Sequence, residues 1–225
     1  MTTSAPIRGV IFDMDGVLCD SEPLIAEAAG LMFREKYGAP ATAADFHPFI
    51  GTGEERFLGG VAEKYGVKLQ PGVDKDRTYE IYLQLIPDRL QPLPGAHEFV
   101  AAARTRGLKL ALATSADRVK LHGNLAAIKL PESRFDAAIT GGDVQRKKPY
   151  PDIFLLAAER IGVKPADCLV VEDAPSGLQA GRAAGCRCLG ITSTFDAARL
   201  RTAGANWIAA DLAHAFALLA DLAPA

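Results

Sequence analysis

The sequence predicts an α/β protein with a parallel sheet, interrupted after its first strand by an all-helical segment. A short apolar run, Val10-Ile11-Phe12, stands close to the start of the chain. The stretch from 21 to 90 shows only the apolar spacing of helices, and strands alternate with helices from residue 109 onward. Such alternation is typical of a parallel sheet covered by helices on both faces.

The interrupting segment is expected to contain three helices. The first begins at Ser21, a favourable N-cap residue, and ends at Tyr37, just before Gly38. Two more are indicated by apolar residues at helical spacing: Phe57, Leu58, Val61 and Tyr65, then Tyr79, Tyr82, Leu83 and Ile86. A segment rich in helix breakers follows, with Pro87, Pro92, Pro94 and Gly95.

We therefore expect a helical cap domain at 21–90 and an α/β core domain made of 1–20 plus 91–225. The later strands of the core are expected at 109–113, 135–139, 167–171, 186–191 and, more weakly, 207–208. Its helices are expected from 117 onward, then at 152–161, 175–184, 196–203 and 212–222. Ligands of such sheets bind outside the carboxyl ends of the strands, so a segment inserted after the first strand would cover them as a lid.

The composition argues against several classes of function. The 225 residues include 25 basic and 27 acidic side chains, and a formal charge of −2 argues against nucleic acid as the main partner. No apolar run reaches the roughly 18 residues of a membrane span, and the first residues lack a secretory pattern. A monomer in the cytoplasm is expected, with reduced thiols at Cys19, Cys168, Cys186 and Cys188.

The candidate chemistry lies where the apolar strands end. The first strand leads into Asp13-Met14-Asp15-Gly16, and the strand at 109–113 leads into Thr114-Ser115. Lys148 precedes a predicted helix, and the strand at 167–171 leads into Glu172-Asp173. Parallel strands all end at one edge of the sheet, so four carboxylates, a hydroxyl and an ammonium would share one crevice.

Four carboxylates in one crevice require a cation or shared protons. Two of them at 4 Å repel by roughly 4 kcal/mol at an effective dielectric near 20. An all-oxygen ligand set suits Mg²⁺, which carboxylates and substrate phosphates commonly hold. One carboxylate could then attack a phosphoryl group, and a second could protonate the leaving oxygen and activate water. Lys148 and the hydroxyl of Thr114 could hold the phosphoryl oxygens.

Each of these residues also has a structural explanation when it is taken alone. Asp15-Gly16 could form a turn, Thr114 could cap a helix and Lys148 could be solvated. The acidic pair at 172–173 could cap the helix that begins at Pro175. The joint placement of all of them at predicted strand ends favours the functional interpretation.

These segments resemble the motifs of the haloacid dehalogenase superfamily of phosphotransferases. The likeness rests on Asp-Met-Asp-Gly-Val-Leu at 13–18, on Thr114, on Lys148 to Asp152 and on Glu172 to Gly177, in the expected order. It covers nearly the whole chain. It implies a Rossmann-like core with an inserted helical cap, of the kind found in β-phosphoglucomutase and phosphoglycolate phosphatase.

The resemblance also implies roles for individual residues. Asp13 would be the nucleophile, Asp15 the general acid and base, and Thr114 and Lys148 would stabilise the phosphate and its charge. Mg²⁺ would be bound by Asp13, Asp173 and the backbone carbonyl of Asp15, with Glu172 supporting it through water. The remaining predicted substrate contacts are Gly16, Ser115, Arg118, Gly51, Thr52 and Glu54.

The cap segment from Pro48 to Ala62 resembles the corresponding domain of a larger chloroplast protein of plants. This likeness adds the chloroplast stroma, for a processed plant or algal domain, to the cytoplasm as an expected compartment. Within the segment, Gly51-Thr52-Gly53 could reach the substrate as a lid loop, or Thr52 and Glu55 could cap the following helix.

The cap departs from β-phosphoglucomutase at three positions. Ile25 matches the place of that enzyme's cap histidine, and Ile50 and Glu54 stand where it has a lysine and an arginine. A bisphosphate intermediate needs cations, so we favour a Mg²⁺-dependent phosphatase that hydrolyses a small phosphomonoester through a phosphoaspartate. A sugar phosphate or a phosphoglycolate-like compound would be the substrate. The alternatives are a sugar-phosphate mutase, a receiver-type signalling domain and a non-catalytic regulatory module.

Overall fold

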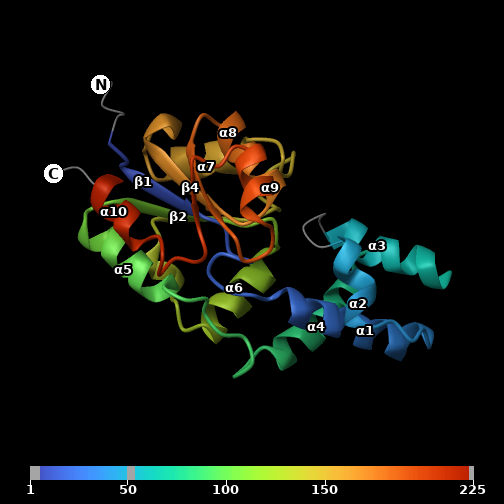
Figure 1. The fold of residues 1–225 in the computed structure, drawn as a ribbon. Coiled ribbons are helices and arrows are strands. Elements are labelled where there is room, and N and C mark those ends of the chain that lie inside the picture. Colours follow the sequence, from blue (N-terminus) through green and yellow to red (C-terminus); the bar gives the residue numbers. More distant parts are fainter. Residues whose placement is uncertain (1–5, 50–53, 223–225) are drawn as a thin grey trace.

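The core of the protein is a single parallel sheet. The computed structural model describes residues 6–49 and 54–222 of the chain, without the side chains of 54–55 and 220–222. Six strands lie in the order β3-β2-β1-β4-β5-β6, and every neighbouring pair is parallel (Figure 1). The strands are β1 (Gly9–Phe12), β2 (Lys109–Ala113), β3 (Ala137–Ile139), β4 (Cys168–Glu172), β5 (Arg187–Ile191) and β6 (Trp207–Ala209). The predicted α/β class with a parallel sheet is confirmed.

Helices cover both faces of this sheet. The core helices are α5 (Ala96–Thr105), α6 (Arg118–Ala127), α7 (Asp152–Arg160), α8 (Pro175–Ala183), α9 (Ala197–Thr202) and α10 (Phe216–Leu222). Figure 1 shows α5 and α10 on one face, and α7, α8 and α9 on the other. Successive β1 side chains alternate between the faces, so Val10 and Phe12 join one hydrophobic cluster and Ile11 joins the other.

The segment between β1 and β2 is helical. It contains α1 (Glu22–Tyr37), α2 (Ala43–Phe46), α3 (Glu54–Tyr65) and α4 (Val73–Leu85), with a 3-10 turn at His47–Phe49. Helices α1 and α4 pack against each other. The ring of Phe46 in α2 contacts the rings of Phe33 in α1 and Phe57 in α3, with centroid distances of 6.0 and 4.8 Å. These helices lie to one side of the sheet in Figure 1, and their buried apolar residues belong to the same hydrophobic cluster as Val10 and Phe12 of β1.

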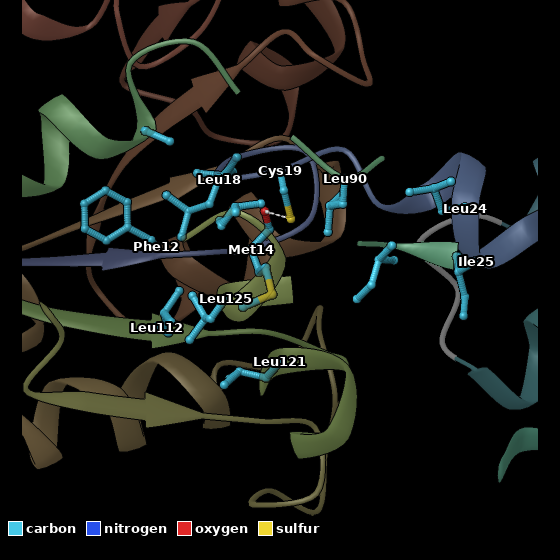
Figure 2. Packing of buried hydrophobic residues seen from close by; sticks show 14 of the residues in the cluster. Phe12, Met14, Leu18, Cys19, Leu24, Ile25, Leu90, Leu112, Leu121 and Leu125 are labelled. Carbon is cyan, nitrogen blue, oxygen red and sulfur yellow. Dashed lines mark hydrogen bonds between the residues drawn. The ribbon is translucent and has the colours of Figure 1, made fainter. Parts of the chain in front are cut away.

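A second set of contacts anchors the start of the cap to the core. Figure 2 shows Met14, which follows β1, next to Leu125 of α6. Met14 and Leu18 are fully buried, and the amide of Asn124 lies 3.3 Å from the Met14 sulfur. The chain therefore leaves β1 through a packed segment before it enters the cap.

The structure adds to the predicted elements at a few places. The sequence interpretation did not include α2 or α5, because α2 is a single turn and α5 directly follows a proline-rich segment. Strand β3 begins at Ala137 instead of Phe135, whose ring packs edge-on against Phe12 at 6.1 Å. Gly38 ends α1 in the left-handed conformation, as expected. No helix among the described residues is long and apolar enough to cross a membrane.

Candidate active site

The polar residues that follow β1, β2 and β4 meet in one cavity. Phe12 pairs in register with both Leu112 and Val171, so the three strands end at the same level. Glu172 at the end of β4, and Asp13, Thr114 and Asp173 directly after the three strands, therefore emerge side by side. The cavity holds about 130 Å³ and is also lined by Asp15, Ser115 and Lys148, together with side chains from the cap.

Lys148 joins two of the carboxylates. Its Nζ lies 2.6 Å from Asp13 Oδ1 and 2.6 Å from Glu172 Oε1, and it donates to the carbonyl of Ala113 at 3.1 Å. Only 7% of the Lys148 side chain is exposed. Burial by itself lowers the pKa of this ammonium, but the two carboxylates raise the pKa further than burial lowers it. Lys148 therefore stays protonated and neutralises part of the acidic cluster.

Three carboxylates lie close enough to hold one metal ion. Oxygen atoms of Asp13, Glu172 and Asp173 all lie within 4.8 Å of one another, and all three residues are buried. Burial, followed by the charges of Glu172 and Asp15, raises the pKa of Asp13 to about 7, although Lys148 opposes this. Burial and the charges of Glu172 and Asp13 also raise the pKa of Asp173. The cluster thus carries more negative charge than Lys148 offsets, which favours a further cation.

Two glycines let the backbone approach these carboxylates. Gly16 has a φ of +77°, and a Cβ built there would fall 2.0 Å from Asp173 Oδ2. A Cβ on Gly177, in the first turn of α8, would fall 1.8 Å from Glu172 Oε1. Glu172 Oε2 also accepts the backbone N–H groups of Asp173 and Ala174, at 3.1 Å each. The position of Glu172 is therefore fixed by both its donors and the absence of a side chain at 177.

Asp15 faces a different set of partners from Asp13. Its carboxylate accepts from Lys120 Nζ at 2.9 Å, from Asn124 Nδ2 at 3.3 Å and from the hydroxyl of Ser21. Asn124 Oδ1 in turn accepts from the hydroxyl of Tyr82, on cap helix α4, at 2.5 Å. A continuous chain of hydrogen bonds thus runs from the cap to Asp15.

Sequence reasoning missed Lys120, Asn124 and Ser21 as parts of the site. Ser21 occupies the predicted N-cap position of α1, but its hydroxyl caps no backbone N–H and binds Asp15 instead. Lys120 and Asn124 stand four residues apart on α6, where they interrupt the buried face formed by Leu121 and Leu125. That pair of polar residues on an apolar helix face was the available signal.

The predicted phosphate contacts next to β2 differ in their surroundings. Thr114 is buried, and its Oγ1 accepts the backbone N–H of Ala116 at 3.1 Å. Ser115 lines the cavity, as Thr114 does. Arg118 instead lies over another surface groove, where it donates to the carbonyl of Ala138 and forms an ion pair with Asp143 at 3.1 Å.

The predicted cap contacts lie mostly beyond what the structure describes. Gly51 and Thr52 are outside the described residues. Glu54 begins α3, but its side chain is not among those described. The two interpretations of Gly51-Thr52-Gly53, a lid loop or a helix cap, therefore stay predictions.

Comparison with known proteins identifies the family. The haloacid dehalogenase-like hydrolase family matches residues 7–185, which hold every acidic residue of the cavity. The chain is a haloacid dehalogenase-like hydrolase. The superfamily resemblance of its motifs is thereby confirmed.

Individual members of this family are similar over most of the chain. The protein SUPPRESSOR OF QUENCHING 1, chloroplastic, of Arabidopsis thaliana is 44% identical over 92% of this chain, which spans only 20% of that protein. A phosphorylated carbohydrates phosphatase of Thermotoga maritima is 35% identical, over 88% of this chain and 92% of its own. The crystal structure of a putative β-phosphoglucomutase from Thermotoga maritima has a TM-score of 0.79 and 33% identity, over 96% of this chain and 100% of that one.

Proposed function

We propose that this haloacid dehalogenase-like hydrolase is a Mg²⁺-dependent phosphatase that releases phosphate from a small phosphomonoester through a phosphoaspartate at Asp13. The observation that carries the proposal is the contact of Lys148 with both Asp13 and Glu172, beside a third carboxylate at Asp173. Phosphatases among the similar proteins support it. The proposal includes a cap domain at 21–90 over a core of 1–20 and 91–225, which matches the helical segment between β1 and β2.

The donor set fits Mg²⁺. Asp13, Glu172 and Asp173 supply carboxylate oxygens only, and the ammonium of Lys148 offsets only part of their negative charge. The backbone carbonyl of Asp15 is the further proposed ligand. When bound, the ion would neutralise charge on the carboxylates and on the phosphoryl oxygens.

Asp13 and Asp15 have separate tasks in the proposed reaction. A carboxylate oxygen of Asp13 forms a bond to phosphorus as the ester oxygen leaves, and Asp15 gives that oxygen its proton. Asp15 then takes a proton from water, whose oxygen attacks phosphorus and releases Asp13 and inorganic phosphate. Lys148 and Thr114, beside Asp13, hold the phosphoryl oxygens. The first Asp15 step needs its protonated form and the second its ionised form.

A sugar-phosphate mutase is the second candidate, because one of the solved structures that resemble this chain is described as a putative β-phosphoglucomutase. A mutase must bind a bisphosphate, and the position of its cap histidine is the apolar Ile25 here. Conversion of a hexose 1-phosphate without net phosphate release would favour the mutase. The expected substrate is a small phosphorylated metabolite. A monomer, and the cytoplasm or chloroplast stroma as its compartment, stay predictions.

The experiment that tests the phosphatase is the variant Asp13→Asn. It should abolish Mg²⁺-dependent release of phosphate from 4-nitrophenyl phosphate while the circular dichroism spectrum stays unchanged. Asp88→Asn is the matched control, since Asp88 is exposed and its φ of 61° suits asparagine equally well. Retention of most of the activity in Asp13→Asn would exclude Asp13 as the nucleophile.

A further inference from the structure

Beside its acidic cluster, the cavity has a set of aliphatic and aromatic lining residues. The cap contributes Ile25 of α1, Phe49, Phe57 of α3 and Tyr79 of α4, and the core adds Phe195. Ile25, Phe57 and Tyr79 are each less than 10% exposed, so they form a packed wall. A substrate with its phosphoryl group at Asp13 would share this cavity with these side chains.

The cations that line the cavity are already bound by carboxylates. Lys148 contacts Asp13 and Glu172, and Lys120 contacts Asp15. Both ammonium groups belong to side chains that are only 7% exposed. Glu22 also lines the cavity and adds a further carboxylate beside Lys120.

Three further cations, on α3, α4 and α6, do not line the cavity and are paired as well. Arg56 contacts Glu63, Lys75 contacts Asp117, and Arg118 contacts Asp143, at 3.0, 2.6 and 3.1 Å. Within the described part of the chain, a second anionic group on the substrate therefore meets an apolar wall and carboxylates.

We propose that the preferred substrate is a phosphomonoester whose leaving group is uncharged, and that the cavity discriminates against esters with a second anionic group such as a carboxylate or another phosphate. This inference rests on the proposed phosphatase function and specifies its substrate class.

The physical reason is the cost of removing a charge from water. A carboxylate against Ile25 and Phe57 loses its hydration and gains no cation in exchange. The buried hydroxyl of Tyr79, which has no hydrogen-bond partner, offers one donor but no positive charge. Lys120 could serve it only by giving up Asp15, the group that transfers the proton. A neutral leaving group has no such requirement, and its apolar surface gains from contact with the aromatic rings. Discrimination therefore comes from an unfavourable environment for the wrong substrate.

Two pairs of substrates test the effect of a negative charge on the leaving group. The first pair is 2-hydroxyethyl phosphate and 2-phosphoglycolate, and the second is phenyl phosphate and 4-carboxyphenyl phosphate. Within each pair the leaving groups are similar, and one member carries a carboxylate. The neutral member should have a kcat/KM at least about tenfold higher in the presence of Mg²⁺.

Substitutions at Ile25 test the wall directly. Ile25→Lys places an ammonium in the cavity, and Ile25→Met is the matched control of similar length without charge. Relative to Ile25→Met, Ile25→Lys should raise the kcat/KM ratio of anionic to neutral substrate by about tenfold or more. Circular dichroism and melting temperature show whether both variants fold. If Ile25→Lys does not fold, the kcat/KM values of the wild-type protein for the two substrate pairs test the inference.

The two proposals fail in different ways. Hydrolysis of the anionic members as fast as, or faster than, their neutral partners would overturn the charge inference and leave the phosphatase function intact. Absence of Mg²⁺-dependent phosphate release from all four compounds, with Asp13→Asn indistinguishable from wild type, would reject the phosphatase function itself.

Discussion

Lys120 Nζ lies 2.9 Å from Asp15 Oδ2, although the two residues are 105 positions apart in the sequence. The ion pair is almost fully enclosed, with 7% of the Lys120 side chain and 17% of the Asp15 side chain exposed. Burial by itself lowers the pKa of Lys120, but the charges of Asp15 and Glu22 raise the pKa above its ordinary value. Lys120 therefore fixes the position of the carboxylate that is proposed to transfer protons.

The first prediction concerns this contact. Lys120→Met should lower kcat for an alkyl phosphate at least about tenfold, and lower it much less for 4-nitrophenyl phosphate. The reason is that an alkoxide needs a proton from Asp15 as it leaves, whereas nitrophenolate is stable without one. Lys120→Arg should restore part of the activity. Equal losses with both substrates would show that Lys120 has only a structural role.

The second prediction concerns the metal ion. Chelation should abolish activity, and Mg²⁺ at 100 times its Kd should stabilise the folded protein by about 2.7 kcal/mol. For a chain of this size that corresponds to a rise of roughly 5–10 °C in Tm, measured by scanning calorimetry. Asp173→Asn should remove most of this rise because one carboxylate ligand is lost. If Mg²⁺ raised the Tm of Asp173→Asn as much as that of wild type, Asp173 would not be a ligand of the ion.

The third prediction compares two helical glycines. Gly177→Ala should reduce activity strongly, because its Cβ would fall 1.8 Å from Glu172 Oε1 and displace that carboxylate. Gly59→Ala in α3 is the control, since a Cβ there has no neighbour within 4 Å. The control should keep its activity and gain about 0.5–1 kcal/mol of stability from helix propensity. Phosphate-release assays and urea unfolding measure the two effects.

The fourth prediction concerns pH and the cap. Asp74 of α4 is buried, which raises its pKa, but donors from Lys36, Tyr37 and the backbone of Gln70 lower the pKa further, to below its ordinary value. Its contribution to stability is therefore present above the unfolded pKa of about 3.9 and is lost as pH falls through the folded value. Asp74→Asn should have a lower free energy of unfolding than wild type at pH 7, measured by urea denaturation. The difference between the two free energies should become smaller below about pH 4.

Much of the fold could be predicted because local patterns carry it. The strands at β1, β2 and β4 are apolar runs that end in polar residues. The end of α1 could be predicted because a glycine, Gly38, directly follows its last periodic residues, and glycine readily adopts the left-handed conformation found there. Helix α2 could not be predicted in the same way, because one turn shows no periodicity. The predicted strand at 135–139 is two residues longer than β3, because an apolar residue such as Phe135 can pack on the sheet without pairing in it.

For the candidate site, the sequence by itself determined which carboxylates, hydroxyl and lysine stand at the strand ends, because parallel strands share one edge and the motif order is local. Only the tertiary structure decided their partners. Lys148 bridges Asp13 and Glu172, while Asp15 is held by Lys120 and is linked through Asn124 to the cap. Side chains from a helix distant in sequence meet the strand end only when α6 packs beside it, and no spacing rule encodes that contact.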